Sequence, residues 1–135
     1  LNNTFNELNN LYDSPEKIFY KGIRTGRSKV ETFISYSMGL IASLILKHRF
    51  NEINAQPTIF SYDLLRKIKK PPHDFSFDTY IYWIALKNGY KFIRKKFDFP
   101  PRVYGKSKWN FGVISRLRFS KNLILYFFKL RKQNL

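Results

Sequence analysis

Apolar residues along this chain recur at spacings that predict helices separated by short strands. Intervals of three and four positions, typical of one face of a helix, run through residues 1–12 and again through residues 28–47. Ser28 followed by Glu31 forms a capping-box pair, which marks the start of the second helix. The second helix therefore has both a hydrophobic face and a defined beginning.

Glycine, proline and basic residues divide the rest of the chain into shorter elements. Gly22 and Gly26, set among basic residues, predict a cationic turn at 22–27 after a strand at 18–20. The further elements that we predict are a strand at 58–60, a short helix at 62–70, a helix at 77–88, a strand at 90–97, a loop at 102–110 and two helical pieces after Phe111. This order indicates an α/β fold that is rich in helix and has a few short strands.

Composition is that of one globular domain without cysteine chemistry. The chain has 135 residues, of which 44% are apolar and 19% aromatic, enough to bury a core. Cysteine is absent, so disulfides and thiolate metal sites are excluded. His48 and His73 lie too far apart in the sequence to form a local metal motif, and we predict no metal site within the chain.

The formal net charge of +16 predicts attraction to polyanions. Nucleic acid, an anionic lipid surface and phosphorylated substrates all satisfy it, so the charge does not choose among them. The longest apolar stretch, residues 33–46, is shorter than the roughly 20 residues that a membrane-spanning helix requires. A buried or interfacial helix fits this stretch better.

Four short motifs place cations, amides and carboxylates where a transferase would use them. They are Lys21-Gly22-x-Arg24-x-Gly26-Arg27, Asn54-Ala55-Gln56-Pro57-x-x-Phe60, Asp74-Phe75-Ser76-Phe77-Asp78 and Arg102-x-x-Gly105-x-Ser107-Lys108-Trp109-Asn110. In this order they resemble the C-terminal part of a family 2 glycosyltransferase of GT-A type, similar to bacterial polyprenyl-phosphate sugar synthases of the dolichyl-phosphate mannose synthase kind. The resemblance implies that residues 1–110 form the acceptor-side part of a GT-A domain. It also implies that the donor-binding half lies before Leu1, so that the fragment alone is inactive.

The last motif implies a site for the diphosphate of the sugar donor. The resemblance assigns Arg102, Ser107 and Lys108 to it. An inverting transferase must stabilise the charge that grows on its leaving group, and paired cations do so directly. A solvated basic loop is the alternative reading of this motif taken alone.

The first three motifs imply the acceptor site and the catalytic group. Arg24 and Arg27 correspond to the place where polyprenyl-phosphate enzymes gather the acceptor phosphate, and Asn54 with Gln56 to the acceptor-side turn. Asp78 is the candidate general base for a hydroxyl acceptor.

Each of these assignments has a structural alternative. Asp74 and Asp78 can simply complement a helix dipole, and the two amides can simply brace a turn. The chain also departs from the family pattern at Tyr62, where relatives carry a basic residue.

The C-terminal segment, residues 111–135, is predicted to be a basic amphipathic helical tail. From Phe99 onward the chain has no acidic residue, while Lys and Arg alternate with large apolar residues. Segments of this kind lie on anionic membrane surfaces. The alternative is a docking helix that covers the core of the domain.

Taken with the resemblance, these features imply an inverting glycosyltransferase of the cell envelope, peripheral on the cytoplasmic face of the membrane. It would move a sugar from a nucleotide-sugar donor to polyprenyl phosphate. A divalent cation, Mg²⁺ or Mn²⁺, is expected for the complete enzyme, with ligands outside this chain.

Three alternatives remain for the function. They are a glycan-building transferase with a saccharide hydroxyl acceptor, a noncatalytic membrane-surface protein, and a nucleic-acid-binding protein. Nucleic acid is not expected as a partner, because most aromatic residues occupy positions predicted to be buried and no nucleic-acid-binding fingerprint is present.

Overall fold

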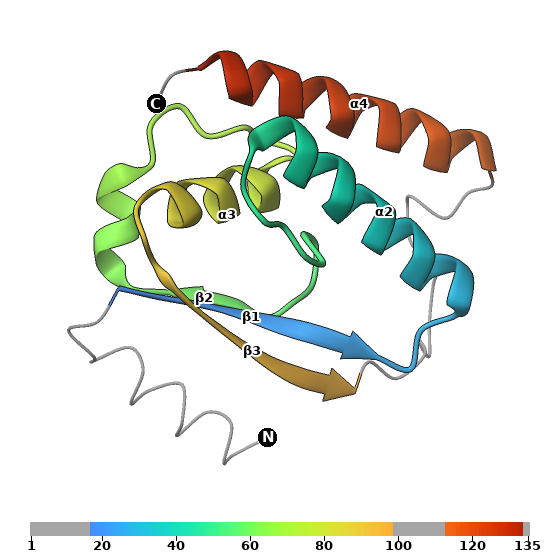
Figure 1. Cartoon of the computed structure of the whole chain (residues 1–135), viewed down its shortest axis with the longest axis horizontal. Helices are drawn as coiled ribbons and strands as arrows, with labels where there is room; N and C mark the ends of the chain where they lie inside the picture. The colour runs from blue at the N-terminus through green and yellow to red at the C-terminus, as the bar shows by residue number, and fades with distance from the viewer. Residues whose placement is uncertain (1–16, 99–112, 134–135) are drawn as a thin grey trace.

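A computed structural model describes residues 17–98 and 113–133 of the chain. They form a helix-rich α/β protein in which three α-helices lie on one side of a three-stranded sheet (Figure 1). The elements in chain order are β1 (Ile18–Thr25), α2 (Lys29–Leu46), β2 (Thr58–Phe60), the 3₁₀ helix η1 (Tyr62–Lys67), α3 (Phe77–Lys87), β3 (Lys91–Asp98) and α4 (Val113–Lys132).

The sheet has the strand order β2-β1-β3, with β1 in the centre. β1 runs antiparallel to β2, so that Phe19 is opposite Phe60, and parallel to β3, so that Ile18 is opposite Lys91. The connection between the parallel strands β1 and β3 therefore contains α2, β2, η1 and α3, and α4 follows β3. This connection brings the residues of the candidate site to one end of β1.

Aromatic rings join the sheet to α3. Phe19 of β1 stacks on Tyr82 of α3, with ring centroids 5.6 Å apart, and also contacts Phe60 and Phe92 of the flanking strands. All side chains from Thr79 to Ala85 are buried, because α3 lies between the sheet and the outer helices. Along these positions the helix has no solvent-exposed face.

The inner face of α4 belongs to the same hydrophobic cluster as the sheet and α3. Leu123, Phe127 and Leu130 are buried in it, together with Ala42 and Ile45 of α2. Burying three large side chains in this way contributes roughly 1.5–3 kcal/mol for each of them. The inner face of α4 thus covers the core of the domain. This is the packing that the alternative interpretation of residues 111–135, as a helix covering the core, describes.

The structure confirms the long helix and corrects three boundaries. The side-chain oxygen of Ser28 accepts a hydrogen bond from the backbone amide of Glu31, as the capping pattern predicts. The predicted turn at 22–27 is wrong for residues 22–25, because β1 continues to Thr25 along its parallel partner β3, and the chain turns at Gly26 with φ of 74°.

The other two corrections concern helices. The predicted helix at 62–70 is a 3₁₀ helix that ends at Lys67. The two helical pieces predicted after Phe111 are one helix, α4, since neither proline nor glycine interrupts residues 113–132. The helix predicted in residues 1–12 and the loop predicted at 102–110 lie outside the described residues.

Candidate functional site

A cavity of about 320 Å³ lies beside the end of β1, where α2, α4 and the start of α3 meet the segment 51–57. Among its lining residues are all five predicted acceptor and catalytic residues that the structure describes. These are Arg24, Arg27, Asn54, Gln56 and Asp78. The predicted donor-site residues Arg102, Ser107 and Lys108 lie outside the described residues.

Glu52 holds both predicted acceptor arginines. Its Oε1 lies 3.1 Å from Nη1 of Arg27 and 3.7 Å from Nε of Arg24, while its Oε2 accepts a hydrogen bond from the backbone amide of Arg24 at 3.3 Å. The same Nη1 of Arg27 donates to Oγ of Ser35 on α2 at 2.9 Å. The two guanidinium groups are therefore fixed in place before any ligand binds, which lowers the entropic cost of binding an anion.

The cavity carries a surplus of positive charge. Arg24, Arg27 and Arg116 line it, against the single carboxylate of Asp78, and Glu52 lies behind the first two. Burial lowers the pKa of Arg24, the neighbouring charge of Arg27 lowers it further, and Glu52 opposes both. An anion would relieve this repulsion, and the planar fork of arginine matches the oxygen atoms of phosphate.

The Asn54–Pro57 segment lies directly on β1. The backbone amide of Gly22 donates to the carbonyl oxygen of Pro57 at 2.9 Å. A Cβ atom at position 22 would stand 2.3 Å from the carbonyl oxygen of Gln56, a distance that real contacts do not reach. Gly22 is thus the residue that lets the first and second motifs pack together.

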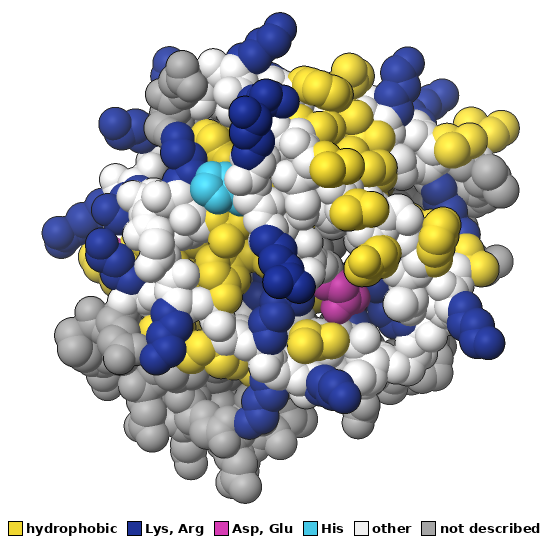
Figure 2. All heavy atoms as spheres, viewed as in Figure 1, with side chains coloured by type: hydrophobic (Ala, Val, Ile, Leu, Met, Phe, Trp, Pro, Cys, Tyr) yellow, Lys and Arg dark blue, Asp and Glu magenta, His cyan; other side chains and the backbone are white. Residues whose placement is uncertain are grey.

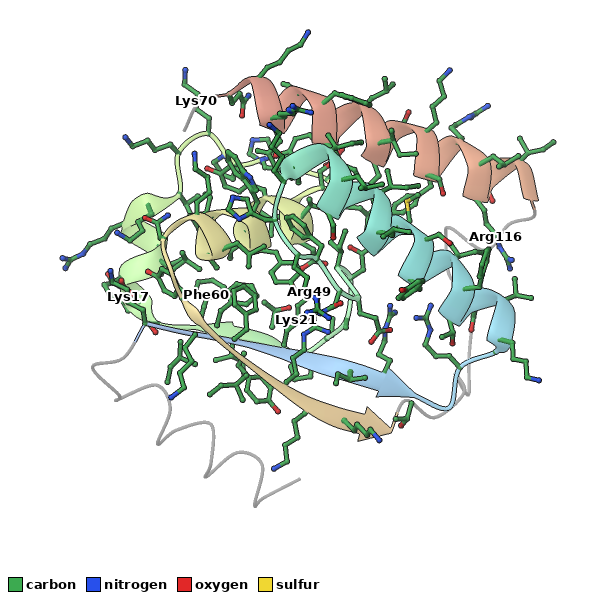
Figure 3. The ribbon with its side chains drawn as sticks, viewed as in Figure 1. Lys17, Lys21, Arg49, Phe60, Lys70 and Arg116 are labelled. Atoms are coloured by element: carbon green, nitrogen blue, oxygen red, sulfur yellow. The ribbon has the colours of Figure 1, made fainter. Side chains whose placement is uncertain are left out.

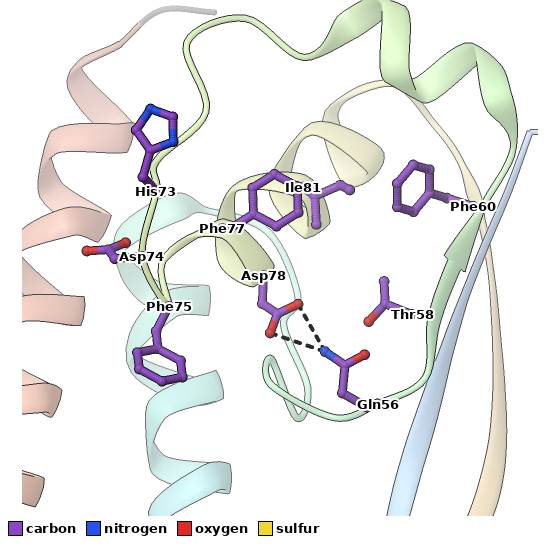
Figure 4. A pocket seen from close by; sticks show the side chains of 9 residues that line it. All are labelled: Gln56, Thr58, Phe60, His73, Asp74, Phe75, Phe77, Asp78 and Ile81. Carbon is purple, nitrogen blue, oxygen red and sulfur yellow. Dashed lines mark hydrogen bonds between the residues drawn. The ribbon is translucent and has the colours of Figure 1, made fainter. Parts of the chain in front are cut away.

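The two amides of this segment face the cavity in different ways. Asn54 Oδ1 is buried and has no hydrogen-bond partner among the described residues. Gln56 Nε2 lies 3.4 Å from Oδ1 and Oδ2 of Asp78, and the two side chains point toward each other in Figure 4. Gln56 therefore braces the carboxylate, while the carbonyl oxygen of Asn54 remains available to a donor.

Asp78 is half-buried in the first turn of α3. Burial raises the pKa of its carboxyl group, while the positive charge of Lys21 and the hydrogen bond from Gln56 act in the opposite direction. A carboxylate whose pKa is raised is a stronger base than an exposed one. In the sequence, the position of Asp78 at the start of a helix allowed two roles, a general base or a partner of the helix dipole. In the structure the same position also lines the cavity.

A second and larger cavity, of about 750 Å³, also lies next to Asp78 (Figure 4). It shares Gln56, Phe75 and Asp78 with the first cavity, so these three residues form the wall between the two. Its other lining residues are Thr58, Phe60, His73, Asp74, Phe77 and Ile81. Asp78 can therefore reach a ligand in either cavity.

Lys21 is a residue of this region that the sequence did not assign to the site. Its side chain points from β1 toward the helices (Figure 3) and is 0% exposed. Nζ donates to Oγ1 of Thr58 at 2.9 Å and stands 5.8 Å from the ring centroid of Tyr82. Burial lowers the pKa of Lys21 to about 8, and the negative charges of Asp78 and, to a smaller extent, Glu52 oppose the change.

The described residues contain no group of three or more His, Cys, Asp or Glu side chains that could hold a metal ion. His73 lines the larger cavity together with Asp74 and Asp78.

The comparisons with known proteins add no relative to this description. No protein-family model, no curated protein sequence and no solved structure matches the chain. The cavity and the charges around it are the basis on which a function is proposed.

Proposed function

We propose that this chain is the acceptor-side part of an inverting glycosyltransferase of GT-A type, and that the smaller cavity binds the phosphate of a polyprenyl-phosphate acceptor. One observation carries the proposal. Five residues singled out by the sequence motifs, from three separate segments of the chain, line one cavity. Their convergence is structural context that supports reading the separate short motifs as parts of one site.

The reaction is a displacement at the anomeric carbon of the sugar donor. A phosphate oxygen of the acceptor forms a bond to that carbon, while the bond from the carbon to the nucleoside diphosphate breaks and the diphosphate leaves with the electron pair. Arg24 and Arg27 hold the attacking phosphate, with Glu52 fixing their orientation. A phosphate is already ionised at neutral pH, so this acceptor needs no general base.

The donor side of the proposal rests on residues outside the described part of the chain. Arg102, Ser107 and Lys108 would bind the leaving diphosphate, since paired cations stabilise the charge that develops on it. A divalent cation, Mg²⁺ or Mn²⁺, belongs to the complete enzyme and has its ligands outside this chain, where it would neutralise the same diphosphate. The complete enzyme would be peripheral on the cytoplasmic face of the membrane and serve the cell envelope.

A saccharide acceptor is the second candidate, because the larger cavity favours it. Phe60, Phe75 and Phe77 line that cavity next to Asp78, and flat apolar side chains beside a carboxylate suit a sugar ring and its hydroxyl groups. In this reaction the attacking atom is a hydroxyl oxygen, and the carboxylate of Asp78 takes its proton. The raised pKa of Asp78 suits that role.

Transfer assays on the full-length protein that contains this chain test the proposal. With polyprenyl phosphate in vesicles as acceptor, Arg24→Gln should lower kcat/KM by roughly 10²-fold, because a charge-assisted contact to the reacting phosphate is lost. Arg66→Gln, which changes an exposed arginine of η1, is the matched control and should leave the rate unchanged. Equal effects of the two changes would contradict the phosphate assignment.

Asp78→Asn separates the two acceptors. Transfer to polyprenyl phosphate should be tolerated, whereas transfer to a saccharide hydroxyl should fall by about 10²-fold or more. Transfer to saccharides alone, abolished by Asp78→Asn, would establish the second candidate in place of the first. Absence of transfer to either acceptor, with a functional donor site, would overturn both.

A further inference from the structure

Helix α2 has one face in the core and another that nothing in the described chain covers. Gly39, Ala42, Ile45 and Leu46 are its buried residues. On the opposite side, at intervals of three and four positions, are Phe33 (70% exposed), Tyr36 (68%), Leu40 (51%) and Leu44 (71%). An apolar stripe of this length on the surface indicates a binding surface rather than scattered exposed residues.

Helix α4 also exposes large apolar residues, and basic residues accompany them. Its exposed large apolar residues are Ile114, Leu117, Leu125 and Phe128, and Arg118, Lys121, Lys129 and Lys132 are exposed on the same side of the helix. The helix contains no acidic residue. In Figure 2 the hydrophobic side chains gather over α2 and α4, with Lys and Arg side chains around them.

The length and composition of α2 alone would also allow it to cross a membrane. Among the helices in the described part of the chain, α2 alone is long and apolar enough to do so. Its other face, however, is packed against α4 and the core. A helix held in this way can lie along a membrane surface without leaving the domain, whereas crossing the bilayer would require it to detach.

We propose that α2 and α4 form a docking face for an anionic membrane surface. The docking face consists of Phe33, Tyr36, Leu40 and Leu44 of α2 with Ile114, Leu117, Leu125 and Phe128 of α4. The apolar side chains enter the headgroup region, and the cations of α4 contact anionic lipid. An anionic lipid surface is complementary both to the apolar stripe and to the net charge of +16.

The docking face is on the same two helices that line the phosphate cavity. Ile34, Ser35 and Met38 of α2 line the cavity, and Arg116, Phe119, Ser120 and Leu123 of α4 line it from the other helix. The cavity thus lies between the two helices that contact the leaflet. This role of the cavity rests on the proposed function: the phosphate of a lipid would reach Arg24 while the hydrocarbon chain of the lipid remains in the membrane.

Co-sedimentation of the chain with lipid vesicles tests the docking face without any transfer reaction. Vesicles of phosphatidylcholine with about 30% phosphatidylglycerol should bind the chain at least tenfold more tightly than pure phosphatidylcholine, and added salt should weaken the binding. Phe33→Ser with Leu44→Ser should weaken binding by tenfold or more. Tyr62→Ser with Leu65→Ser, on the exposed side of η1, is the matched control and should have no effect.

Three outcomes would overturn the docking face. They are absence of binding to anionic vesicles, equal losses in the two double variants, and a concentration-dependent dimer that only the α2 variant abolishes, which would assign the face to a second copy of the chain. Circular dichroism checks that each variant is folded. Because the vesicles contain no polyprenyl phosphate, vesicle binding can fail while transfer persists, and transfer can fail while binding persists.

Discussion

Gln56 Nε2 lies at the same distance, 3.4 Å, from both carboxylate oxygens of Asp78. The contact joins the 51–57 segment to the first turn of α3 and stands in the wall between the two cavities. At this length it is a weak hydrogen bond. The carboxylate is therefore oriented while its oxygens keep the capacity to accept a further proton or hydrogen bond.

Asp78→Asn should stabilise the protein at pH 7. Burial raises the folded-state pKa of Asp78 above the ordinary value of 3.8, so the folded state binds the proton more tightly than the unfolded state does. The cost of burying the charge is fully present above the folded pKa, and it disappears as the pH falls through that pKa toward 3.8. Thermal unfolding should give a higher Tm for the variant at pH 7, and the difference should shrink in acid. A lower Tm at pH 7 would contradict the burial cost.

Lys21→Met should also stabilise the protein, with the opposite pH dependence. Burial lowers the pKa of Lys21 from 10.5 to about 8, so below pH 8 the folded state carries a buried charge at a cost on the order of 3 kcal/mol. Between about pH 8 and 10.5 the folded wild type releases a proton that the unfolded chain retains, and its stability rises. Denaturant unfolding at pH 7 and pH 10 should show the advantage of the variant decreasing with pH.

The matched control for this change is Lys96→Met, at an exposed position of β3. Its effect on the free energy of unfolding should be small and should not repeat the change between pH 7 and pH 10. If Lys21→Met raises the free energy of unfolding by the same amount at both pH values, the charge of the buried ammonium group is not what destabilises the wild type.

Gly22→Ala should destabilise the protein by about 1–3 kcal/mol, because the new methyl group would overlap backbone atoms that cannot rotate away. Gly89→Asn is the control. Gly89 has φ of 69°, and a Cβ atom at this position would meet no other atom within 4 Å, while asparagine tolerates the backbone conformation. Chemical denaturation of the two variants should therefore give a large loss for the first and a small one for the second. Comparable losses would contradict the close approach at Gly22.

Glu52→Gln should destabilise the protein by on the order of 2 kcal/mol, because Arg24 and Arg27 would lose the counter-charge between them. Phosphate should reverse part of this loss by occupying the cavity as a replacement anion. We expect added phosphate to raise the Tm of the variant more than that of the wild type. Sodium chloride at the same ionic strength is the control, and an equal effect of both salts would count against a phosphate site.

Part of the fold followed from local patterns in the sequence. The start of α2 at Ser28 and the position of β2 depend on capping and on short apolar runs, which act within a few residues. The end of β1 could not be predicted in this way, since Gly22 to Thr25 are held in strand conformation by pairing with β3. The single helix α4 was open to prediction, because its sequence contains no helix breaker.

Sequence motifs could single out part of the candidate site. The residues that reach the site only through tertiary packing could not be found in this way. The order of the motifs singled out Arg24, Gln56 and Asp78, which line one cavity. Glu52 was missed, because an acid in a polar connection gives no sign that two arginines will pair with it. Lys21 lies two residues after Phe19 in β1, so it is on the face of the sheet that packs against α3, and a prediction of the full-length strand would have placed it there.

The parallel pairing of β1 with β3 has a consequence for how the chain is made. Ile18 leaves the ribosome roughly seventy residues before its partner Lys91, so β1 must wait, unpaired on that side, while α2, β2 and α3 are synthesised. Long-range pairing of this kind slows folding and leaves a strand edge open to other chains. Basic side chains at Arg24 and Arg27 would repel a second copy during that interval, so the charges that line the cavity would also protect the nascent chain from aggregation.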